Sequence, residues 1–362
     1  MKKGKKRIII TFTIVLCLAL AALSMMIYVK HQMSKIPKLS FQEALEYTTK
    51  DNPNALIAVG IIKDGQMSYR VYGENGKELS ATLSIYEIGS ITKTFTAALI
   101  NKAMLEGKIN IEDTIEKYLT LPGGKKYPSV KELLTHTSGY KGYYFENPMI
   151  SNFLNGRNDY YGITKRIALN RARRLSQDRE SYSYNYSNFG FAILGLVLEK
   201  VYDTDYSTLV TNFAQNELGL SNTGISSHPG DSGNYWDWME NDAYLPAGGI
   251  TSTIFDMLLF AQLQLEESPY FSQCHKSLQR IMASSKAYAD MEINLDEIGM
   301  SWIIDNKNGI IWHNGGTESY NSYLGFRPEK NTAVVVLSNF APNYRIPATV
   351  LGVKLLLELD QD

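Results

Sequence analysis

Residues 89–95 read Gly89-Ser90-Ile91-Thr92-Lys93-Thr94-Phe95, and apolar residues at helical spacing follow them as far as Leu105. This pattern predicts a helix that begins close to Ser90. Residues three positions apart share one helix face, so the Lys93 side chain can reach the Ser90 oxygen. A partly buried lysine loses its proton more easily and can act as a base, while the N-terminal end of a helix stabilises developing negative charge. The segment therefore predicts a nucleophilic serine activated by a lysine.

The Ser-x-x-Lys pattern alone is not specific, because Ser138-Gly139-Tyr140-Lys141 also has it. Ser138 lies in a turn-like Thr-Ser-Gly sequence, which favours a structural role. The plain alternative for Ser90 is that its hydroxyl only caps the helix, which is the commoner use of a serine at such a position. The neighbouring sequence has to decide between these interpretations.

Apolar segments with β-propensity occur at both ends of the chain. Residues 55–62 and 67–72 flank the turn signal Asp64-Gly65 and predict a β-hairpin. Further strands are predicted at residues 301–304, 309–312, 322–326 and 332–337. Helices are predicted at residues 41–50 with Ser40 as N-cap, at 346–359, and in the middle at 94–105, 130–134, 189–201 and 254–265. This arrangement predicts one sheet with a helical insertion at about 95–290.

The N-terminus has the features of a membrane anchor. Residues 1–7 carry five basic side chains and no acidic one, and residues 8–29 are uncharged. As a helix this stretch would span about 30 Å, the thickness of the hydrocarbon core of a bilayer. The positive-inside rule leaves the basic end in the cytoplasm and the chain after residue 30 outside. A cleaved signal peptide is the alternative, since Ala19-Leu20-Ala21 resembles a cleavage site, but the apolar run continues beyond it.

We therefore expect a single-pass anchor in the cell membrane. A linker at residues 30–40 would join it to one extracytoplasmic domain at residues 41–362. No internal repeat or low-complexity segment divides that domain.

The composition excludes several classes of function. Removing the five basic residues of the N-terminus leaves 31 lysines and arginines against 37 acidic residues, a formal charge of −6. Such a domain lacks the cationic surface that nucleic-acid binding requires. The two cysteines cannot form a disulfide framework. The five histidines show no metal-binding spacing and no phosphate loop is present, so neither a metal nor another cofactor is expected.

Five sequence blocks in a fixed order carry a resemblance to one family. The blocks are Gly89–Phe95, Ser129–Gly139, Tyr186-Ser187-Asn188 with Phe189-Gly190, Ala247–Thr253 with Asp256-Met257, and His313–Thr317. Together they resemble the serine β-lactamases and penicillin-recognising DD-peptidases, in particular the branch of class C β-lactamases, low-molecular-weight DD-peptidases and esterases. Each block alone is weak, but five in order over residues 40–360 are hard to obtain by chance.

The resemblance implies a fold as well as a chemistry. The fold is of the α/β (α+β), β-lactamase/transpeptidase-like class, with an antiparallel sheet, flanking terminal helices and a helical subdomain. Ser90 would attack a carbonyl to give an acyl-enzyme, and Lys93 would keep Ser90 nucleophilic. Tyr186 would carry protons, with a phenol pKa lowered by the lysine. Asn188 would bind the substrate amide and help to position Lys93.

The third motif departs from the β-lactamase form. His313-Asn314-Gly315 stands where β-lactamases have Lys-Thr-Gly, whose cation meets the substrate carboxylate. A neutral histidine binds a carboxylate more weakly, which puts efficient β-lactam hydrolysis in doubt. His313 and Gly315 are expected at the substrate, and the backbone N–H groups of Ser90 and Gly316 are expected to form the oxyanion hole. The plain alternative for His313 is a histidine that is satisfied within its strand.

Aromatic residues leave a second question open. The resemblance implies a cleft wall in the segment that contains Tyr140, Tyr143, Tyr144, Phe145, Tyr160 and Tyr161. These rings could stack on substrate, but packing is an equally good interpretation. Among the neighbouring tyrosines only Tyr186 has an asparagine two positions on. His136 is interpreted as a loop anchor.

The sequence thus predicts a serine hydrolase that cleaves a D-amino-acid peptide or ester bond. The first expectation is a D-alanyl-D-alanine carboxypeptidase-like enzyme acting on small D-alanyl fragments of the cell wall, with β-lactams as possible ligands. An esterase, including one that removes D-alanine from teichoic acids, and a class C-like β-lactamase are alternatives. A non-catalytic protein that binds β-lactams or wall fragments is the alternative from another class. The intact Ser90, Lys93, Tyr186 and Asn188 set argues against it.

Overall fold

The computed structural model describes residues 34–80, 84–225, 234–266 and 268–360, together with positions 12, 13, 16, 20 and 24. The expected cytoplasmic end at residues 1–7 and most of the expected membrane segment at residues 8–29 lie outside the described residues. Within the described part, no helix is both long and apolar enough to cross a bilayer. The anchor therefore remains a prediction.

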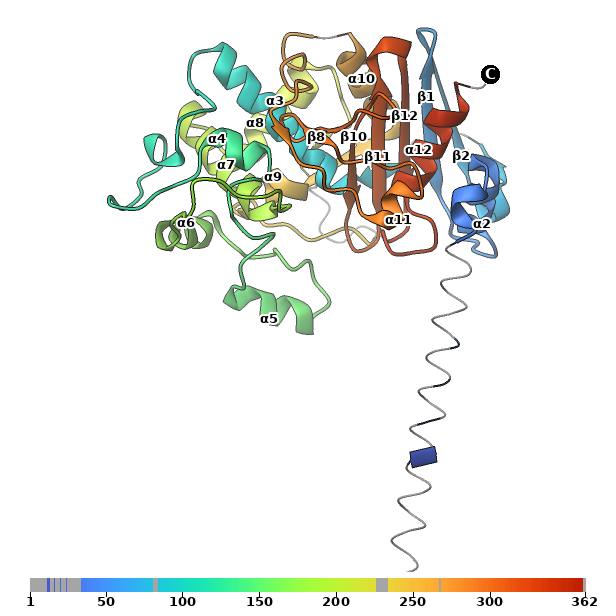
Figure 1. Ribbon diagram of the computed structural model, residues 1–362, viewed down its shortest axis with the longest axis horizontal. Helices are drawn as coiled ribbons and strands as arrows, with labels where there is room; N and C mark the ends of the chain where they lie inside the picture. The colour runs from blue at the N-terminus through green and yellow to red at the C-terminus, as the bar shows by residue number, and fades with distance from the viewer. Residues whose placement is uncertain are drawn as a thin grey trace, which may run out of the picture.

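A nine-stranded antiparallel sheet, in the order β3-β2-β1-β12-β11-β10-β9-β8-β7, supports the fold (Figure 1). Pairing of β1 with β12 joins the N-terminal hairpin to the C-terminal strands, as predicted. The strands are β1 Ile57–Lys63, β2 Gln66–Tyr72, β3 Glu78–Leu79, β7 Gln279–Arg280, β8 Glu297–Ile298, β9 Ile303–Asp305, β10 Ile310–Gly316, β11 Asn321–Arg327 and β12 Thr332–Ser338. The predicted hairpin and the four predicted C-terminal strands are thereby confirmed.

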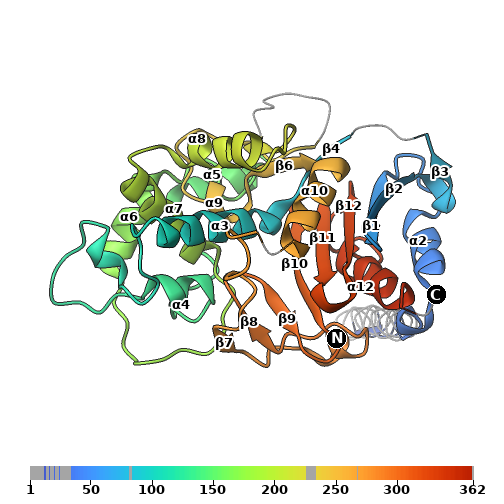
Figure 2. The ribbon, with the colours of Figure 1, turned by 90° about the horizontal axis from the view of Figure 1, so that it is seen from above.

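Helices cover both faces of this sheet: α2 (Phe41–Thr49) and α12 (Ala348–Glu358) lie on one face and α10 (Ile254–Leu265) on the other (Figure 2). Alternate residues of β12 point to the two layers, since Val334 and Val336 join the core beneath α12 while Val335 joins the core beneath α10. Two covered faces explain why β11 and β12 are buried along their whole length. The antiparallel sheet and the flanking terminal helices are confirmed.

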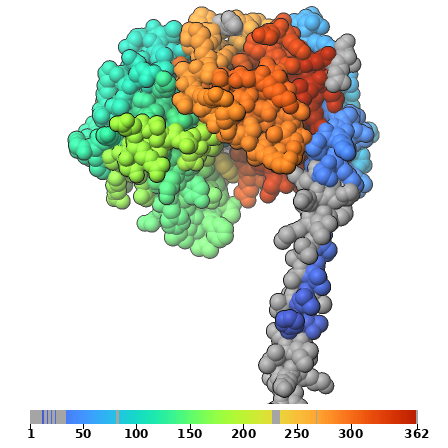
Figure 3. Space-filling model, in the orientation of Figure 1, coloured from blue at the N-terminus to red at the C-terminus, as the bar shows by residue number. Residues whose placement is uncertain are grey.

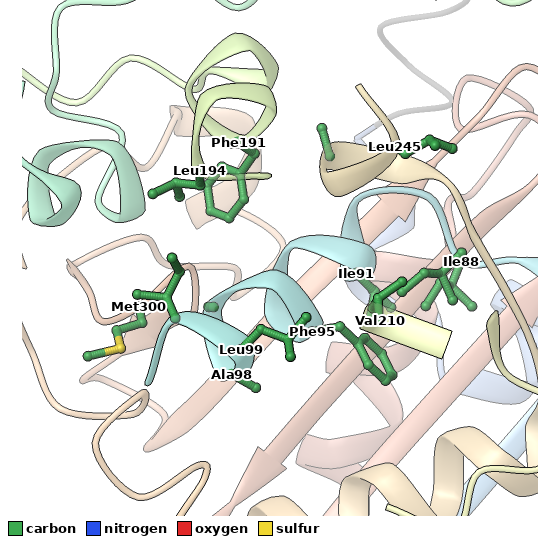
Figure 4. Close-up of a cluster of buried hydrophobic side chains, with 14 of the residues drawn as sticks. Ile88, Ile91, Phe95, Ala98, Leu99, Phe191, Leu194, Val210, Leu245 and Met300 are labelled. Carbon is green, nitrogen blue, oxygen red and sulfur yellow. The ribbon is translucent and has the colours of Figure 1, made fainter. Parts of the chain in front are cut away.

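Most of the remaining helices form a second lobe beside the sheet. The central helix of this lobe, α3, is buried on nearly every side. Figure 4 shows Phe95 and Leu99 of α3 packed near Phe191 and Leu194 of α7. The remaining helices of the domain, most of which belong to this lobe, are α3 Thr92–Leu105, α4 Val130–Leu134, α5 Asn147–Leu154, α6 Lys165–Arg174, α7 Asn188–Tyr202, α8 Tyr206–Asn212, α9 Leu245–Gly248 and α11 Lys286–Ala289. All the predicted helices are present, and Ser40 caps α2 as expected.

A small second sheet, which the sequence did not predict, joins the two lobes. It has the order β4-β6-β5, with β4 at Ile85–Glu87, β5 at Gly224–Ile225 and β6 at Ile250–Thr253. The chain leaves β4 directly into a 3-10 helix, η3 (Gly89–Ile91), which carries Ser90 and continues into α3. The nucleophile motif therefore lies where the large sheet meets the helical lobe.

Candidate active site

Lys93 and Ser90 lie together, as the spacing predicted. Lys93 Nζ is 3.0 Å from Ser90 Oγ and 2.7 Å from the carbonyl oxygen of Ala247 in α9. The lysine side chain is fully buried, and this burial holds its pKa well below the ordinary value. Nζ donates to the Ala247 carbonyl and to Ser90 Oγ, and once it has lost a proton it can accept the proton of the serine hydroxyl. The Ala247 contact was not predicted, because it depends on a residue far along the chain.

The Ser90 hydroxyl does not serve as a helix cap. Neither η3 nor α3 has a side-chain cap hydrogen bond at its N-terminus. The residue before the serine, Gly89, has φ +49°, and a Cβ atom built on it would lie 2.6 Å from the backbone nitrogen of Gly316. Only glycine combines a positive φ angle with so close an approach of another backbone. The turn at Gly89 thus brings Ser90 close to the end of β10.

The end of β10 is packed against the same turn. A Cβ atom on Gly315 would lie 1.9 Å from the carbonyl oxygen of Ile88, so the two backbones touch. Ser322 on the neighbouring strand β11 donates a hydrogen bond of 2.7 Å to the same carbonyl. Ser90 and Gly316 consequently line the same two cavities. The oxyanion hole formed by their backbone N–H groups stays a prediction.

Tyr186 lies beside Ser90, but its expected acidity is wrong. The Lys93 Nζ atom is 4.8 Å from the centre of the Tyr186 ring. Burial nevertheless raises the pKa of Tyr186, and the hydrogen bond with Ser90 opposes this only in part. Burial also lowers the pKa of the lysine that was expected to lower the pKa of Tyr186, which disfavours the positive charge of that lysine. The phenol therefore stays protonated and can relay a proton only by giving one and taking another.

Asn188 occupies the site, but its expected contact with Lys93 is absent. Its Nδ2 atom donates instead to the hydroxyl of Tyr160, at 2.8 Å, while its Oδ1 atom is buried without a hydrogen-bond partner among the described residues. The cap of α7 is Ser187, whose Oγ accepts from the backbone nitrogen of Gly190. Asn188 is therefore free of a capping role and remains available for a substrate group.

Two buried histidines approach the site and both are neutral. His313 Nδ1 lies 2.6 Å from the carbonyl oxygen of Asn314, so Nδ1 carries the proton. Burial lowers the pKa of His313 to about 3. His136 anchors the loop before α7, as expected, because its Nδ1 accepts from the backbone nitrogen of Ser187 at 3.0 Å. Neither imidazole supplies a positive charge near neutral pH.

Two cavities flank Ser90. One, of about 320 Å³, is lined by His136, Tyr184, Tyr186, Tyr288, Leu295, Ser301, Ile303, Trp312, Pro342 and the His313–Gly316 strand. The other, of about 230 Å³, is lined by Tyr160, Asn188, Trp236, Trp238, Tyr244, Ala247, Gly248 and Gly316. Neither lining contains a lysine or an arginine among the described residues. A carbonyl carbon attacked by Ser90 would thus have one substituent in the larger, mainly apolar cavity and the other in the smaller, more polar one.

Only part of the predicted aromatic wall faces the site. Tyr160 lines the smaller cavity and stacks on Tyr244, with ring centres 4.3 Å apart. Tyr140 and Tyr144 pack on Phe189 and belong to the core or its margin. Most of this cavity's aromatic wall, Trp236, Trp238 and Tyr244, comes from a region that the sequence analysis did not single out.

The sequence pattern of the family described as beta-lactamase matches residues 53–353, which contain every residue of this site. The chain belongs to the β-lactamase family. This family consists of serine hydrolases, and the predicted resemblance to serine β-lactamases and DD-peptidases is confirmed.

Three known proteins illustrate what the chain is similar to. The protein flp of Staphylococcus aureus is 22% identical over 317 residues, which cover 78% of this chain and 59% of flp. The chain thus spans well under two thirds of that relative. The structure of a β-lactamase/D-alanine carboxypeptidase from Yersinia pestis has 20% identity, a TM-score of 0.70 and coverage of 91% and 99%. A D-stereospecific amidohydrolase from Streptomyces has 24% identity, a TM-score of 0.62 and coverage of 83% and 94%. These structures share the fold.

Glu87 is a buried carboxyl group that the sequence analysis missed. Its two oxygens accept hydrogen bonds from the Thr317 hydroxyl, at 2.6 Å, and from the backbone nitrogen of Trp236, at 2.7 Å. It therefore ties the residue after Gly316 to the wall of the smaller cavity. Burial raises the pKa of Glu87 to about 7, although both hydrogen bonds oppose the shift. The sequence signal that could have identified this buried carboxyl group is a single acidic residue within the apolar segment 85–88.

The raised pKa of Glu87 predicts how the free energy of unfolding depends on pH. The folded protein holds this proton more tightly than the unfolded chain, so stability is lost as the pH rises from about 4.5 to about 7. Glu87→Gln keeps an uncharged side chain that can still pair with Thr317. We expect it to equal the wild type at pH 5 and to exceed it at pH 8 by on the order of 2 kcal/mol, measured by urea unfolding. A variant that is less stable at pH 8 would show that the charged carboxylate is favourable.

Proposed function

We propose that this protein hydrolyses D-aminoacyl esters of the cell envelope through an acyl-enzyme on Ser90. The observation that carries the proposal is the contact between Ser90 Oγ and the buried amine of Lys93, whose pKa is lowered by burial. We further propose that residues 8–29 anchor the chain in the cell membrane, with the domain after residue 40 outside the cytoplasm.

The chemistry follows from the positions of these groups. Lys93 Nζ accepts the Ser90 proton while Oγ bonds to the ester carbonyl carbon, and the electron pair of the C=O bond moves to its oxygen. Backbone N–H groups of Ser90 and Gly316 stabilise that oxyanion. Tyr186 passes a proton to the leaving oxygen as the C–O bond breaks, and Lys93 returns a proton to Tyr186. Water then attacks the acyl-enzyme by the same route in reverse.

The larger cavity favours a neutral leaving group. A carboxypeptidase releases an amino acid that carries a carboxylate, and a β-lactam presents a carboxylate on the same side. Among the described residues that line the larger cavity, the ionisable ones are tyrosines and the two uncharged histidines, His136 and His313. Burying an unpaired carboxylate there would cost several kcal/mol. An alcohol leaving group meets no such penalty, which favours the ester over the D-alanyl-D-alanine peptide.

The relatives agree with a D-amino acid on the acyl side. A carboxypeptidase named for D-alanine and an amidohydrolase named for D-stereospecificity share this fold. An extracytoplasmic, membrane-anchored enzyme would meet D-alanyl esters of envelope polymers directly. This combination supports a D-alanyl esterase, with the carboxypeptidase as the second candidate.

A substrate comparison with His313 variants tests the leaving-group argument. We expect the wild type to hydrolyse a neutral D-alanyl ester and to react slowly with an acyl-D-alanyl-D-alanine peptide or a penicillin. His313→Lys introduces an amine that a bound carboxylate would keep charged, and a charge-assisted hydrogen bond between the two is worth about 1.5–3 kcal/mol. The ratio of ester to peptide kcat/KM should therefore fall about tenfold or more.

The matched control is His313→Gln, which stays neutral and should leave that ratio within about threefold of the wild type. Equal ratios in the lysine and glutamine variants would refute the charge argument. Efficient wild-type release of D-alanine from the peptide would restore the carboxypeptidase interpretation.

A further inference from the structure

Helix α5 and the segment before it expose a cluster of large apolar side chains. Ile150, Phe153 and Leu154 have exposed fractions of 52%, 80% and 75%. Tyr143 and Phe145, in the segment before the helix, are exposed by 56% and 61%. We call these five residues the α5 patch. Single exposed apolar residues are ordinary, but a cluster of large ones on one short segment marks an interaction surface.

The rest of the helix is held firmly, so the exposure is not that of a loose segment. Met149 and Asn152 on α5 are buried. Asn152 Nδ2 donates to the carbonyl oxygens of Asp159, at 3.2 Å, and Tyr161, at 2.8 Å. At the start of the helix, Arg171 of α6 donates to Glu146 at 2.8 Å. The domain therefore fixes one face of α5 and presents the other outward.

The position of α5 indicates what covers the patch. In Figure 1, α5 projects from the lower edge of the domain, and the described chain also starts at that edge, beside α2. Figure 3 shows the α5 region as a protrusion on the same side as the start of the domain. The 22 uncharged residues 8–29 precede that start by only a few residues. A bilayer that held residues 8–29 would thus lie on the side toward which α5 projects.

We propose that the α5 patch docks into the outer surface of the membrane that anchors the chain. This proposal rests on the proposed anchor at residues 8–29. Phenylalanine and leucine side chains enter the boundary between headgroups and acyl chains, and tyrosine is favoured at the headgroup level. The adjoining helix α6 exposes Arg166 and Arg174, which suit anionic headgroups.

Docking of α5 would also fix the position of the active site relative to the membrane. The residues that Asn152 holds flank Tyr160, which lines the smaller cavity and accepts the hydrogen bond from Asn188. The smaller cavity is therefore connected to α5 through residues 159–161. With two attachments, the anchor and the patch, the domain would lie in one orientation with this cavity close to the lipid surface. Esters carried close to the membrane would then be the accessible substrates.

A depth measurement on the full-length protein tests the proposal. Phe153→Cys in a Cys17→Ser background carries an environment-sensitive fluorophore, because the remaining Cys274 is buried. The protein is reconstituted in vesicles of phosphatidylglycerol and phosphatidylcholine, with or without brominated acyl chains. We expect blue-shifted emission that the brominated lipids quench at least twofold. The matched control is Phe255→Cys, an exposed phenylalanine on α10, the helix labelled near the upper edge in Figure 1, and this probe should show neither effect.

Each other outcome overturns the proposal. Unshifted emission at position 153 of vesicle-bound protein would show that α5 does not contact lipid. Failure of the protein to stay with the vesicles would instead refute the proposed anchor and, with it, the docking that depends on it. A blue shift without quenching would show that protein, such as a second copy, covers the patch. A probe on Ile150→Cys adds a second reading, because Phe153→Ser with Leu154→Ser should abolish its quenching while leaving the melting temperature unchanged. Quenching that persists in this double variant would also contradict docking by the patch.

Discussion

Replacing Ser90 by alanine is expected to lower kcat/KM for D-alanyl ester hydrolysis by at least about ten-thousand-fold. The variant loses the hydroxyl oxygen that lies 3.0 Å from Lys93 Nζ, and so no acyl-enzyme can form on residue 90. The fold should be unaffected, since the Ser90 hydroxyl caps neither η3 nor α3. Steady-state kinetics with a neutral D-alanyl ester, together with the melting temperature, provide the measurement.

Ser138→Ala is the matched control for this prediction. Ser138 heads the second Ser-x-x-Lys segment, but its hydroxyl accepts a hydrogen bond from the backbone nitrogen of Tyr140 within a turn. Its removal should change kcat/KM by no more than a few fold. Ester hydrolysis that survives in Ser90→Ala and disappears in Ser138→Ala would reverse the assignment of the nucleophile.

The second large effect is expected at Lys93, where two variants separate two roles. If the uncharged amine is the base, Lys93→Arg and Lys93→Met should both lower kcat by about a thousandfold, because neither can accept the serine proton. If the lysine instead acted as a cation that stabilises a Tyr186 phenolate, arginine would retain much of the activity. Near-wild-type turnover by Lys93→Arg would therefore contradict the assignment.

The lowered pKa of Lys93 also fixes the direction of the pH dependence. The amine must be uncharged to accept a proton, so kcat should fall as the pH drops through its depressed pKa. At higher pH the activity should stay constant, rather than rise until the ordinary lysine range is reached. A pH–rate profile that rises up to pH 10 would indicate that the lysine is charged in the folded protein.

Much of the fold could be predicted from local sequence patterns. Alternating apolar residues around Asp64-Gly65 predicted the β1–β2 hairpin, and helical spacing after Ser90 predicted α3. The spacing of Ser90 and Lys93 predicted their contact because both lie within one helical turn. The small β4-β6-β5 sheet was not predicted, because β5 has only two residues and β4 only three. Such short strands carry too little periodicity to be detected.

The site could be predicted only as far as its chemistry depends on nearby residues. The charge of Lys93 and the acidity of Tyr186 depend on burial by several distant segments, and so the expected lowering of the Tyr186 pKa was wrong. Asn188 bonds Tyr160 rather than Lys93, which reflects how residues 158–161 fold back on α7. The Trp236 wall and the contacts of Glu87 arise from equally distant pairs. Long-range packing of this kind leaves no local pattern.

The most direct test of the central claim is to identify the acylated residue. Full-length protein would be mixed with a neutral D-alanyl ester, quenched in acid within milliseconds, digested and mapped by mass spectrometry. We predict a D-alanyl group on the peptide that contains Ser90, transient in the wild type and absent from Ser90→Ala. A D-alanyl group on another side chain, or undiminished turnover by Ser90→Ala, would contradict the account.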